Sequence, residues 1–443
     1  MKFLNHTRGL NVVLIFSFSI FFLTSPAFSK VITQFVPALS ISGEYTDNYH
    51  RTENDKDDEY STIYGADFSF GIIVKKGTLF LNYAPEYTEQ KEFSENDSWR
   101  HEAILEGTYQ AGKNTSLTFS ESFVRDLNQS VRTNNFEKHD TNETSVGMVH
   151  QFGQRDSFGI NYTYFFDLYD EANPDEFKRH NPSAFFGYWF SPKWGFDTNL
   201  SYSNTKHDSS INDSETWSGD IRLLRMINRH LDVYAKYAQS STNQTLGAYD
   251  TYHPSVGFDW RPTDDSGITL GIGVLFQNRD TSGDYDKKRF FLDLDMYKHF
   301  DLTRKSRLSI TGESGYGDVD PLAASLGFNI YGQAGFLYSY QLLRELSSNI
   351  TGSYRVNQYE ESGLVDRTDN TLDLGAGLVW TPLRWLSIDL SYSFIDFDTD
   401  AVGRDDYQEN IGMLTIRLTP SQPVRFDDAN PRRSLENQVF SPR

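Results

Sequence analysis

Apolar and polar side chains alternate one by one along several segments of the chain, and this alternation limits the possible folds more than any other feature. Successive side chains of a β-strand point to opposite faces of the sheet, so such a segment predicts a strand with one apolar and one polar face. The clearest example runs from Ser157 to Tyr169. Its apolar side carries Phe158, Ile160, Tyr162, Tyr164, Phe166 and Leu168, and most of its other side carries Ser157, Gly159, Asn161, Thr163 and Asp167.

The same division recurs along much of the sequence, whereas no stretch of comparable length has the helical period. It is found in residues 68–74, 268–277, 372–380, 386–394 and 414–418. A soluble β-propeller or β-helix also has many strands, but a propeller repeats every 40 to 50 residues or so and its inner strands are apolar on both faces. The chain shows neither pattern. The apolar and polar faces of the strands therefore predict a single sheet with lipid on one side and a polar interior on the other.

The connections between the expected strands alternate between short turns and longer, acidic stretches. Short turns are expected at residues 75–77, 112–114, 192–193, 228–229 and 382–384, and longer loops at residues 52–59, 127–137, 171–177 and 398–406. Outer-membrane barrels combine short periplasmic turns with longer extracellular loops and have an even number of strands. We therefore predict an all-β fold, a single antiparallel up-and-down transmembrane β-barrel of about 18 to 20 strands, with both termini in the periplasm.

The composition agrees with this fold class. The mean hydropathy of −0.56 suggests a soluble protein, yet aromatic residues make up 15% of the 443 residues. A barrel reconciles the two values, because polar side chains face the lumen while aromatic rings gather at the membrane interfaces. The formal net charge is −20, which makes nucleic acid an unlikely partner, and the absence of cysteine excludes disulfides and thiolate sites.

The first residues have the features of a secretory signal peptide. Lys2 and Arg8 precede an apolar run from Leu10 to Leu23, and the small residues Ala27 and Ser29 lie just before a cleavage point ahead of Lys30. We therefore expect a signal peptide at 1–29, a periplasmic segment at 30–37, the barrel at 38–419 and a flexible periplasmic tail at 420–443. The localisation expected from this organisation is the bacterial outer membrane.

If the apolar faces contact lipid, a set of charged side chains lines the lumen, and acids outnumber bases in it. A ring of carboxylates in a narrow pore favours cations and neutral hydroxylated solutes over anions. The alternative is that these residues only pair with one another across neighbouring strands. The predicted pore-lining residues are Asp167, Asp197, Asp232, Asp259, Arg261, Arg289, Asp293, Asp295, Arg355, Asp373, Asp389 and Arg417.

No enzymatic, cofactor or metal site is expected. The Gly-x-Ser-x-Gly nucleophile motif is absent, and Gly271-Ile272-Gly273 lies within an expected strand, where it cannot form a dinucleotide-binding loop. The acidic loop around residues 55–59 lacks the Asp-x-Asp-x-Asp-Gly spacing of a calcium loop. Trp residues near strand ends, such as Trp380 and Trp385, are expected to anchor the barrel at the interface rather than to bind sugar rings.

The C-terminal 120 residues or so carry a more specific signal. They contain Leu326 to Tyr331, Tyr340 to Ser347, Tyr392-Ser393-Phe394, and then Arg404 to Asn410 before a final strand from Leu414 to Leu418. This arrangement resembles the outer-membrane β-barrel porins associated with exopolysaccharide biosynthesis and export systems. The chain departs from that pattern in two ways: two residues instead of one separate Arg404 from Tyr407, and the chain continues beyond the last strand.

The resemblance implies a role in the export or passage of polysaccharide, or of small polar solutes. The implied partners are outer-membrane lipid and lipopolysaccharide, the barrel assembly machinery, polysaccharide and periplasmic export components. A second hypothesis remains open at this point. In it, the protein is a non-conducting structural or adhesive barrel whose acidic surface loops bind divalent cations, lipopolysaccharide or capsule.

Overall fold

The protein is described here from a computed structural model, and the structure describes residues 31–129, 136–170, 176–208, 213–244, 247–279, 287–316, 328–360, 367–400 and 406–426. Nearly all of these residues lie in β-strands, and one short 3-10 helix, η1 (Ser94–Asn96), interrupts them. No helix in the described part of the chain is long and apolar enough to cross a membrane.

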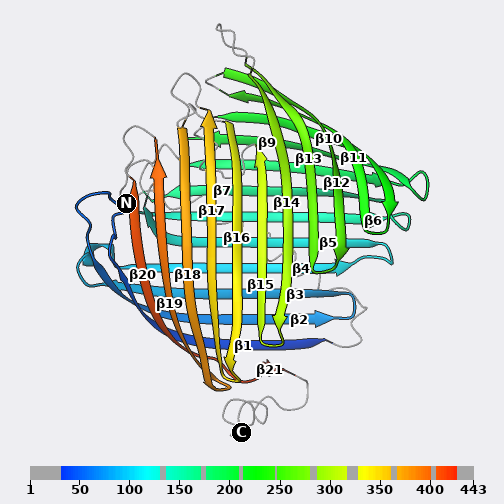
Figure 1. Cartoon of the computed structure of the whole chain (residues 1–443). Coiled ribbons are helices and arrows are strands. Elements are labelled where there is room, and N and C mark those ends of the chain that lie inside the picture. The colour runs from blue at the N-terminus through cyan, green and yellow to red at the C-terminus, as the bar shows by residue number, and fades with distance from the viewer. Residues whose placement is uncertain are drawn as a thin grey trace.

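The strands follow one another around a closed wall (Figure 1). They are β1 (Ile32–Thr46), β2 (Glu59–Val74), β3 (Gly77–Gln90), β4 (Ser98–Gln110), β5 (Thr115–Gln129), β6 (Phe136–Gln151), β7 (Ser157–Tyr169), β8 (Phe177–Tyr188), β9 (Trp194–His207), β10 (Ser214–Asn228), β11 (Leu231–Gln244), β12 (Gly247–Thr263), β13 (Ser266–Arg279), β14 (Lys287–Thr303), β15 (Ser306–Tyr316), β16 (Phe328–Leu343), β17 (Leu346–Glu360), β18 (Arg367–Leu383), β19 (Leu386–Thr399), β20 (Tyr407–Leu418) and β21 (Val424–Arg425).

The first and last long strands close the barrel. Each strand from β1 to β20 pairs antiparallel with the next one in sequence, and β1 pairs with β20 from Leu39 opposite Leu418 to Thr46 opposite Ile411. Closure leaves no unpaired sheet edge, which a barrel needs inside a membrane. The prediction of a single antiparallel up-and-down barrel of 18 to 20 strands is confirmed, with twenty strands in the closed wall.

The barrel extends further toward the N-terminus than the expected start at residue 38. β1 begins at Ile32, because residues 32–37 continue the pairing with β2, and the two-residue strand β21 pairs with Gln34 and Phe35. Part of the expected tail therefore adds to the wall. The expected signal peptide and residues 427–443 lie outside the described residues.

The register assigns the paired strand residues to two faces around the barrel. Directly paired residues of neighbouring antiparallel strands lie on the same face. Register shifts occur only beside short turns, for example between Met226 and Asn228, so the assignment passes unchanged around the whole barrel. One face carries exposed apolar side chains such as Leu39, Ile160 and Leu390, and the other is mostly polar. The apolar face is the outer face and the polar face surrounds the lumen.

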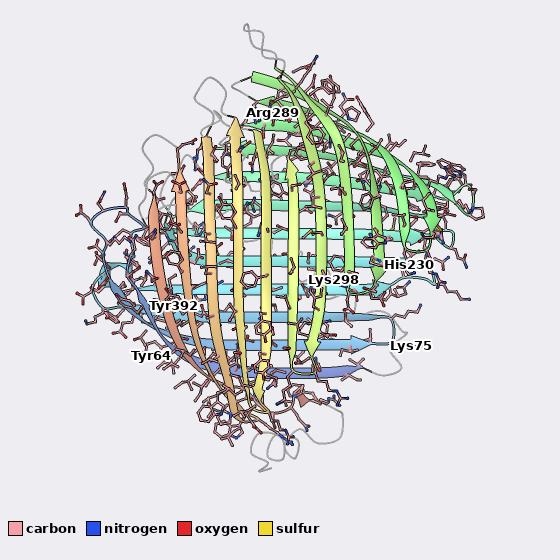
Figure 2. The ribbon with its side chains drawn as sticks, in the orientation of Figure 1. Tyr64, Lys75, His230, Arg289, Lys298 and Tyr392 are labelled. Carbon is pink, nitrogen blue, oxygen red and sulfur yellow. The ribbon has the colours of Figure 1, made fainter. Side chains whose placement is uncertain are left out.

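The strands are strongly tilted. In Figure 1, β14 to β19 cross in front of β1 to β6, as expected when the strands of a barrel tilt by about 35–45°. Figure 2 places Lys75 and His230, which belong to two of the short turns, on the same side of the molecule. The short connections therefore gather at one end of the barrel.

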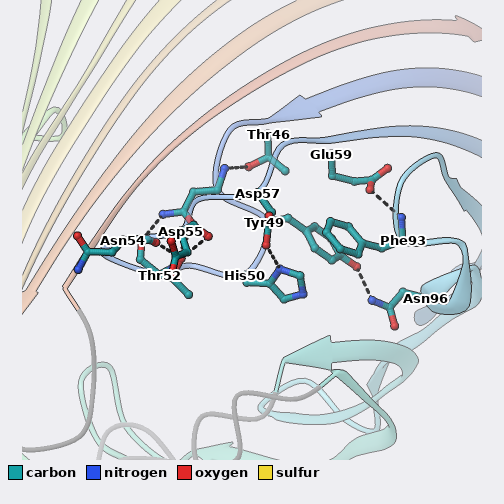
Figure 3. Close-up of polar contacts among 11 residues, drawn as sticks. Thr46, Tyr49, His50, Thr52, Asn54, Asp55, Asp57, Glu59, Phe93 and Asn96 are labelled. Carbon is teal, nitrogen blue, oxygen red and sulfur yellow. Dashed lines mark hydrogen bonds and ion pairs between the residues drawn. The ribbon is translucent and has the colours of Figure 1, made fainter.

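The loop between β1 and β2, called L1 (residues 47–58), packs against the loop that follows β3 and against the first residue of β6. The Tyr49 ring stacks on Phe93 and on Phe136, with centroid distances of 5.0 and 4.7 Å. The Asn96 side-chain amide donates to the Tyr49 hydroxyl at 3.2 Å (Figure 3). Burial raises the pKa of the Tyr49 hydroxyl, an effect that its hydrogen bonds partly offset.

Two buried carboxylates fix L1 and the neighbouring loop in place. Glu59, which is fully buried, accepts hydrogen bonds from the backbone N–H groups of residues 91–93, the shortest from Lys91 at 2.6 Å. Glu409 on β20 accepts from the Thr46 hydroxyl at 2.9 Å and from the Arg51 guanidinium at 3.0 Å. L1 thus links the first strand to the last one at the place where the barrel closes.

Candidate functional site

Eleven of the twelve residues that the sequence predicts as pore-lining lie on the lumen face of the register, and Arg261 lies in the bulge between Trp260 and Thr263. They do not form one cluster. The group with the highest density lies on the consecutive strands β9 to β14 and comprises Asp197, Asp232, Asp259, Arg261, Arg289, Asp293 and Asp295. The others are spread over β7 and over β17 to β20. Their role in conduction stays a prediction.

An arginine on β10 joins two of the predicted acids. Arg222 donates from Nη2 to Asp197 on β9 at 2.8 Å and from Nη1 to Asp259 on β12 at 3.1 Å. Its guanidinium also lies over the ring of Tyr234 on β11, 5.2 Å from the centroid. Arginine makes such planar contacts to carboxylates and aromatic faces more readily than lysine. We call Asp197, Arg222, Tyr234 and Asp259 the Arg222 cluster.

Glycines on the next two strands give Tyr234 its position. A Cβ atom added to Gly257 would lie 2.5 Å from Tyr234 Cζ, and one added to Gly271 would lie 2.8 Å from the Tyr234 hydroxyl. The ring therefore lies flat along the wall, over the strands β12 and β13. Any larger residue at these two positions would push it into the lumen. The flat ring in turn supports the Arg222 guanidinium.

A second contact spans the wall at the same place. Lys236 on β11 reaches Asp293 on β14, with Nζ 3.7 Å from Oδ2, although β12 and β13 lie between them. The lumen-face positions between these two charges are occupied by Ser255, Gly271 and Gly273, which are small enough to leave the path open. Charges on β11 and β14 thus approach each other across these three small residues, which we call the trough.

The adjoining part of the wall, on β15 to β17, repeats the combination of arginine, tyrosine, acid and glycine. Arg355 on β17 lies over the Tyr331 ring at 4.9 Å, and the Tyr331 hydroxyl donates to Glu313 on β15 at 2.6 Å. A Cβ atom added to Gly315 would lie 2.7 Å from that hydroxyl. Here too a glycine lets a tyrosine ring lie along the wall beneath an arginine.

Several other predicted residues have partners within the wall. Asp67 accepts from Arg417 at 2.9 Å across the strand β1, and Asp167 lies 3.1 Å from His139 Nδ1. The hydroxyl groups of Ser353 and Ser387 donate to Asp373 and Asp389, respectively, each at 3.3 Å. The alternative considered from the sequence, that lumen charges pair across strands, therefore describes part of the set.

Hydroxyl and amide side chains cover the lumen face between these charged groups. On β9 to β12 they form direct pairs, such as Ser201 with Ser218 at 2.6 Å and Thr216 with Thr242 at 3.1 Å. They line a cavity of about 960 Å³, whose far side carries Asp293, Asp295, Glu313 and Tyr331. Within the described part of the chain, no group of three or more His, Asp or Glu residues could hold a metal ion.

A second cavity of about 480 Å³ continues from the first one toward the short turns. The two cavities share Phe185, Asn199, Asp220, Lys236 and Asp293. Asp197, Arg222 and Tyr234 of the Arg222 cluster line the second cavity, together with Arg155 in the turn after β6 and Trp189 in the turn after β8. A solute that moves along the lumen on this side therefore passes the hydroxyl-covered region and then the charged region.

Tyr234, Glu313 and Tyr331 were not among the residues predicted from the sequence. The tyrosines were counted with the aromatic residues expected at the membrane interfaces, and their lumen orientation follows only from their register beside Arg222 and Arg355. Glu313 has a signal that could have identified it. It stands in alternation with Ser309 and Thr311 along a short strand, opposite the apolar positions Leu308 and Ile310.

Comparison with known proteins gives a match over the C-terminal strands. The family described as "Putative beta-barrel porin 2" matches residues 324–419, the region whose motifs resemble a porin family. A closed barrel with an apolar outer face and this match lead to one conclusion. The protein is a porin-like outer-membrane β-barrel.

Solved structures with a similar arrangement are other outer-membrane proteins. A ferric enterobactin receptor mutant (Q482A) from Pseudomonas aeruginosa is 9% identical, with a TM-score of 0.45 over 87% of this chain and 81% of that one. The siderophore receptor PirA from Acinetobacter baumannii is 8% identical, with a TM-score of 0.45 over 88% and 81%. OccK2 (OpdF) from Pseudomonas aeruginosa is 11% identical, with a TM-score of 0.42 over 87% and 98%. None of the curated proteins compared with the chain matches it in sequence.

Proposed function

We propose that this barrel is a passive conduit, and not an enzyme, through which neutral or positively charged hydroxylated solutes cross the outer membrane. The short turns and both termini lie in the periplasm in this proposal, and the long loops face the outside. The resemblance of the C-terminal strands to exopolysaccharide-associated porins favours polysaccharide, or fragments of it, as the solute class.

The observation that carries the proposal is the lining of the two connected cavities. Hydroxyl and amide groups on one side exchange hydrogen bonds with a passing sugar as readily as water does, so a hydroxylated solute loses little on entry. Asp220, Asp293, Asp295 and Glu313 add negative charge at the same level, and Lys236 and Arg179 offset only part of it. Carboxylates around a confined aqueous path lower the energy of cations and raise that of anions.

Planar-bilayer recording tests the conduction of ions. We expect steady conductance with cation preference for the complete barrel, and a lower cation conductance when two lumen acids are neutralised in the double variant D293N/D295N. The double variant D396N/D398N is the matched control, because it removes two acids at the same spacing from the outer face of β19. A silent barrel, or equal changes in the two variants, would contradict the proposal.

Flux into liposomes tests the solute class. We expect liposomes that contain the barrel to admit glucose oligomers and their aminated analogues faster than uronic-acid oligomers of equal length. Equal rates for the three kinds of oligomer would show that the lining does not select, and no flux above that of empty liposomes would favour the non-conducting alternative.

A further inference from the structure

Basic side chains lie on the outer face at the loop ends of four of the strands from β5 to β9. Arg125 near the end of β5, Lys138 at the start of β6, Lys178 at the start of β8 and Lys206 at the end of β9 all occupy outer-face positions of the register. Arg125 forms ion pairs with Asp140 and Asp170, at 2.7 and 2.6 Å, so the lysines are the cations that face the lipid. An outer-face cation gains nothing from lipid tails. Its natural contacts at this height are the headgroups of the surrounding lipids.

Two of these lysines are direct cross-strand partners. Lys178 and Lys206 lie opposite each other in the register of β8 and β9, which places their Cβ atoms about 5 Å apart. Like charges in this arrangement destabilise a sheet. Lys206 forms an ion pair with Asp213 at 3.2 Å, but the lysine side chain is 55% exposed, and pairs of this kind contribute little. Glu176, two residues before Lys178 in the sequence, interacts electrostatically with both Lys178 and Asp208, so its negative charge is shared with a second acid.

Aromatic side chains on the same outer face lie directly on the membrane side of the lysine pair. The Tyr162 hydroxyl and His180 Nδ1 are 2.7 Å apart, and the Tyr164 ring lies 4.9 Å from the His180 ring. On the next strands, Tyr202 packs against Trp217 with a centroid distance of 4.6 Å. Amphipathic rings of this kind mark the boundary between lipid tails and headgroups. The lysine pair thus lies one step beyond that boundary, at headgroup height.

We propose that Lys178 and Lys206 bind a lipid A phosphate of lipopolysaccharide, with Lys138 flanking the headgroup and the tyrosine layer contacting the acyl chains. This assignment rests on the proposed orientation, in which the loop ends of the strands face outward. Lipopolysaccharide is the phosphate-bearing lipid of that leaflet. A phosphate between the two lysines accepts hydrogen bonds from both and removes their mutual repulsion, and the anchored lipid seals the barrel surface at β8 and β9.

Binding of purified lipopolysaccharide to the complete, detergent-solubilised barrel tests the proposal. Each lysine near an anionic lipid surface contributes enough that the double variant K178Q/K206Q should bind about 30-fold more weakly. The control K298Q/R225Q removes two charges from the outer face near the short-turn end and should bind normally; Lys298 is labelled in Figure 2. A heat-dependent shift in electrophoretic mobility shows that each variant is folded.

The same assay separates the phosphate from other sources of affinity. Lipopolysaccharide without its lipid A phosphates should bind the unmodified barrel as weakly as intact lipopolysaccharide binds the double variant. Equal affinity of the double variant and the control would overturn the proposal. So would equal displacement by phosphatidylglycerol micelles, because the site would then recognise any anionic lipid. Neither result depends on whether the lumen conducts.

Discussion

Replacing Arg222 with glutamine should make the lumen markedly more cation-selective. The guanidinium holds Asp197 and Asp259 at 2.8 and 3.1 Å, so it neutralises charge in the lining of the second cavity. Glutamine keeps a hydrogen-bond donor at this position but removes the positive charge. Both carboxylates then act on ions in the lumen.

The size of the effect follows from the distances involved. One elementary charge about 5 Å from an ion in water changes the energy of that ion by about 0.8 kcal/mol, which corresponds to a factor of about four in local concentration. Cations gain this factor and anions lose it, and salt at about 0.1 M screens part of both effects. We therefore expect the permeability ratio of potassium to chloride to rise roughly fivefold to tenfold.

Reversal potentials in planar bilayers under a potassium chloride gradient measure this ratio. Arg225 provides the control, because it lies three residues away on the outer face of the same strand, over the Trp194 ring at 5.2 Å. R225Q makes the same chemical change and should leave selectivity unchanged. The effect of R222Q should also disappear near 1 M salt, where the screening length falls to about 3 Å. An unchanged ratio in R222Q, or equal shifts in both variants, would refute the reasoning.

Three further predictions concern stability and the loop L1. G257A should lower the free energy of unfolding by about 1–3 kcal/mol, because the new Cβ would lie 2.1 Å from the Leu270 carbonyl oxygen. Urea titrations of the liposome-inserted barrel measure this loss. G43A is the control and should be neutral, because its new Cβ would have no atom within 4 Å. E409A should expose L1 to protease at pH 7 while the barrel stays folded, because L1 loses its hydrogen bond from Arg51 and the last residue of β1, Thr46, loses the other bond to Glu409. An L1 that resists cleavage as well as before would contradict this. Because burial raises the pKa of Tyr49, its phenol should ionise only above the ordinary value of 10, and L1 should loosen as the pH rises through the raised pKa. The difference between ultraviolet titrations of the unmodified protein and of Y49F measures this ionisation. If Tyr49 titrates like an exposed tyrosine, the aromatic stack of L1 is open.

Alternation alone was enough to define many strands. The segment from Ser157 to Tyr169 was chosen from its apolar and polar faces, and β7 has the same bounds. The expectation of about 18 to 20 strands includes the observed number, since each turn signal stands between two alternating runs. The prediction succeeds because lipid and water impose opposite demands on the two faces, and the demand recurs at every second residue.

The ends of the barrel were harder to predict. Residues 32–37 contain Phe35, Val36 and Pro37, and this sequence does not alternate clearly. Their place in β1 depends on pairing with β2 and with the short strand β21, which lies nearly 400 residues away in the sequence. Pairing between such distant segments leaves no local pattern. L1 has the same difficulty, because its partners on β20 are known only once the barrel is closed.

For the candidate site, the sequence predicted the faces but not the partners. Asp197, Asp259 and Asp293 were placed on the lumen face from alternation, and the register agrees with this placement. Asp197 is the direct cross-strand partner of Arg222. The contact of Asp259 with Arg222 spans one intervening strand and that of Asp293 with Lys236 spans two, distances that neither spacing nor face can indicate.

Small residues decide which of these distant charges meet. Gly271 and Gly273 entered the sequence analysis only as a motif that could not bind a dinucleotide. In the structure, Gly271 together with Gly257 leaves room for the Tyr234 ring to lie against the wall and support Arg222, and the same trough opens the path from Lys236 to Asp293. A bulky side chain on this trough would separate the charges and leave the acids of this region free to act on ions. The electric field along this part of the lumen therefore depends on its glycines as much as on its charged residues.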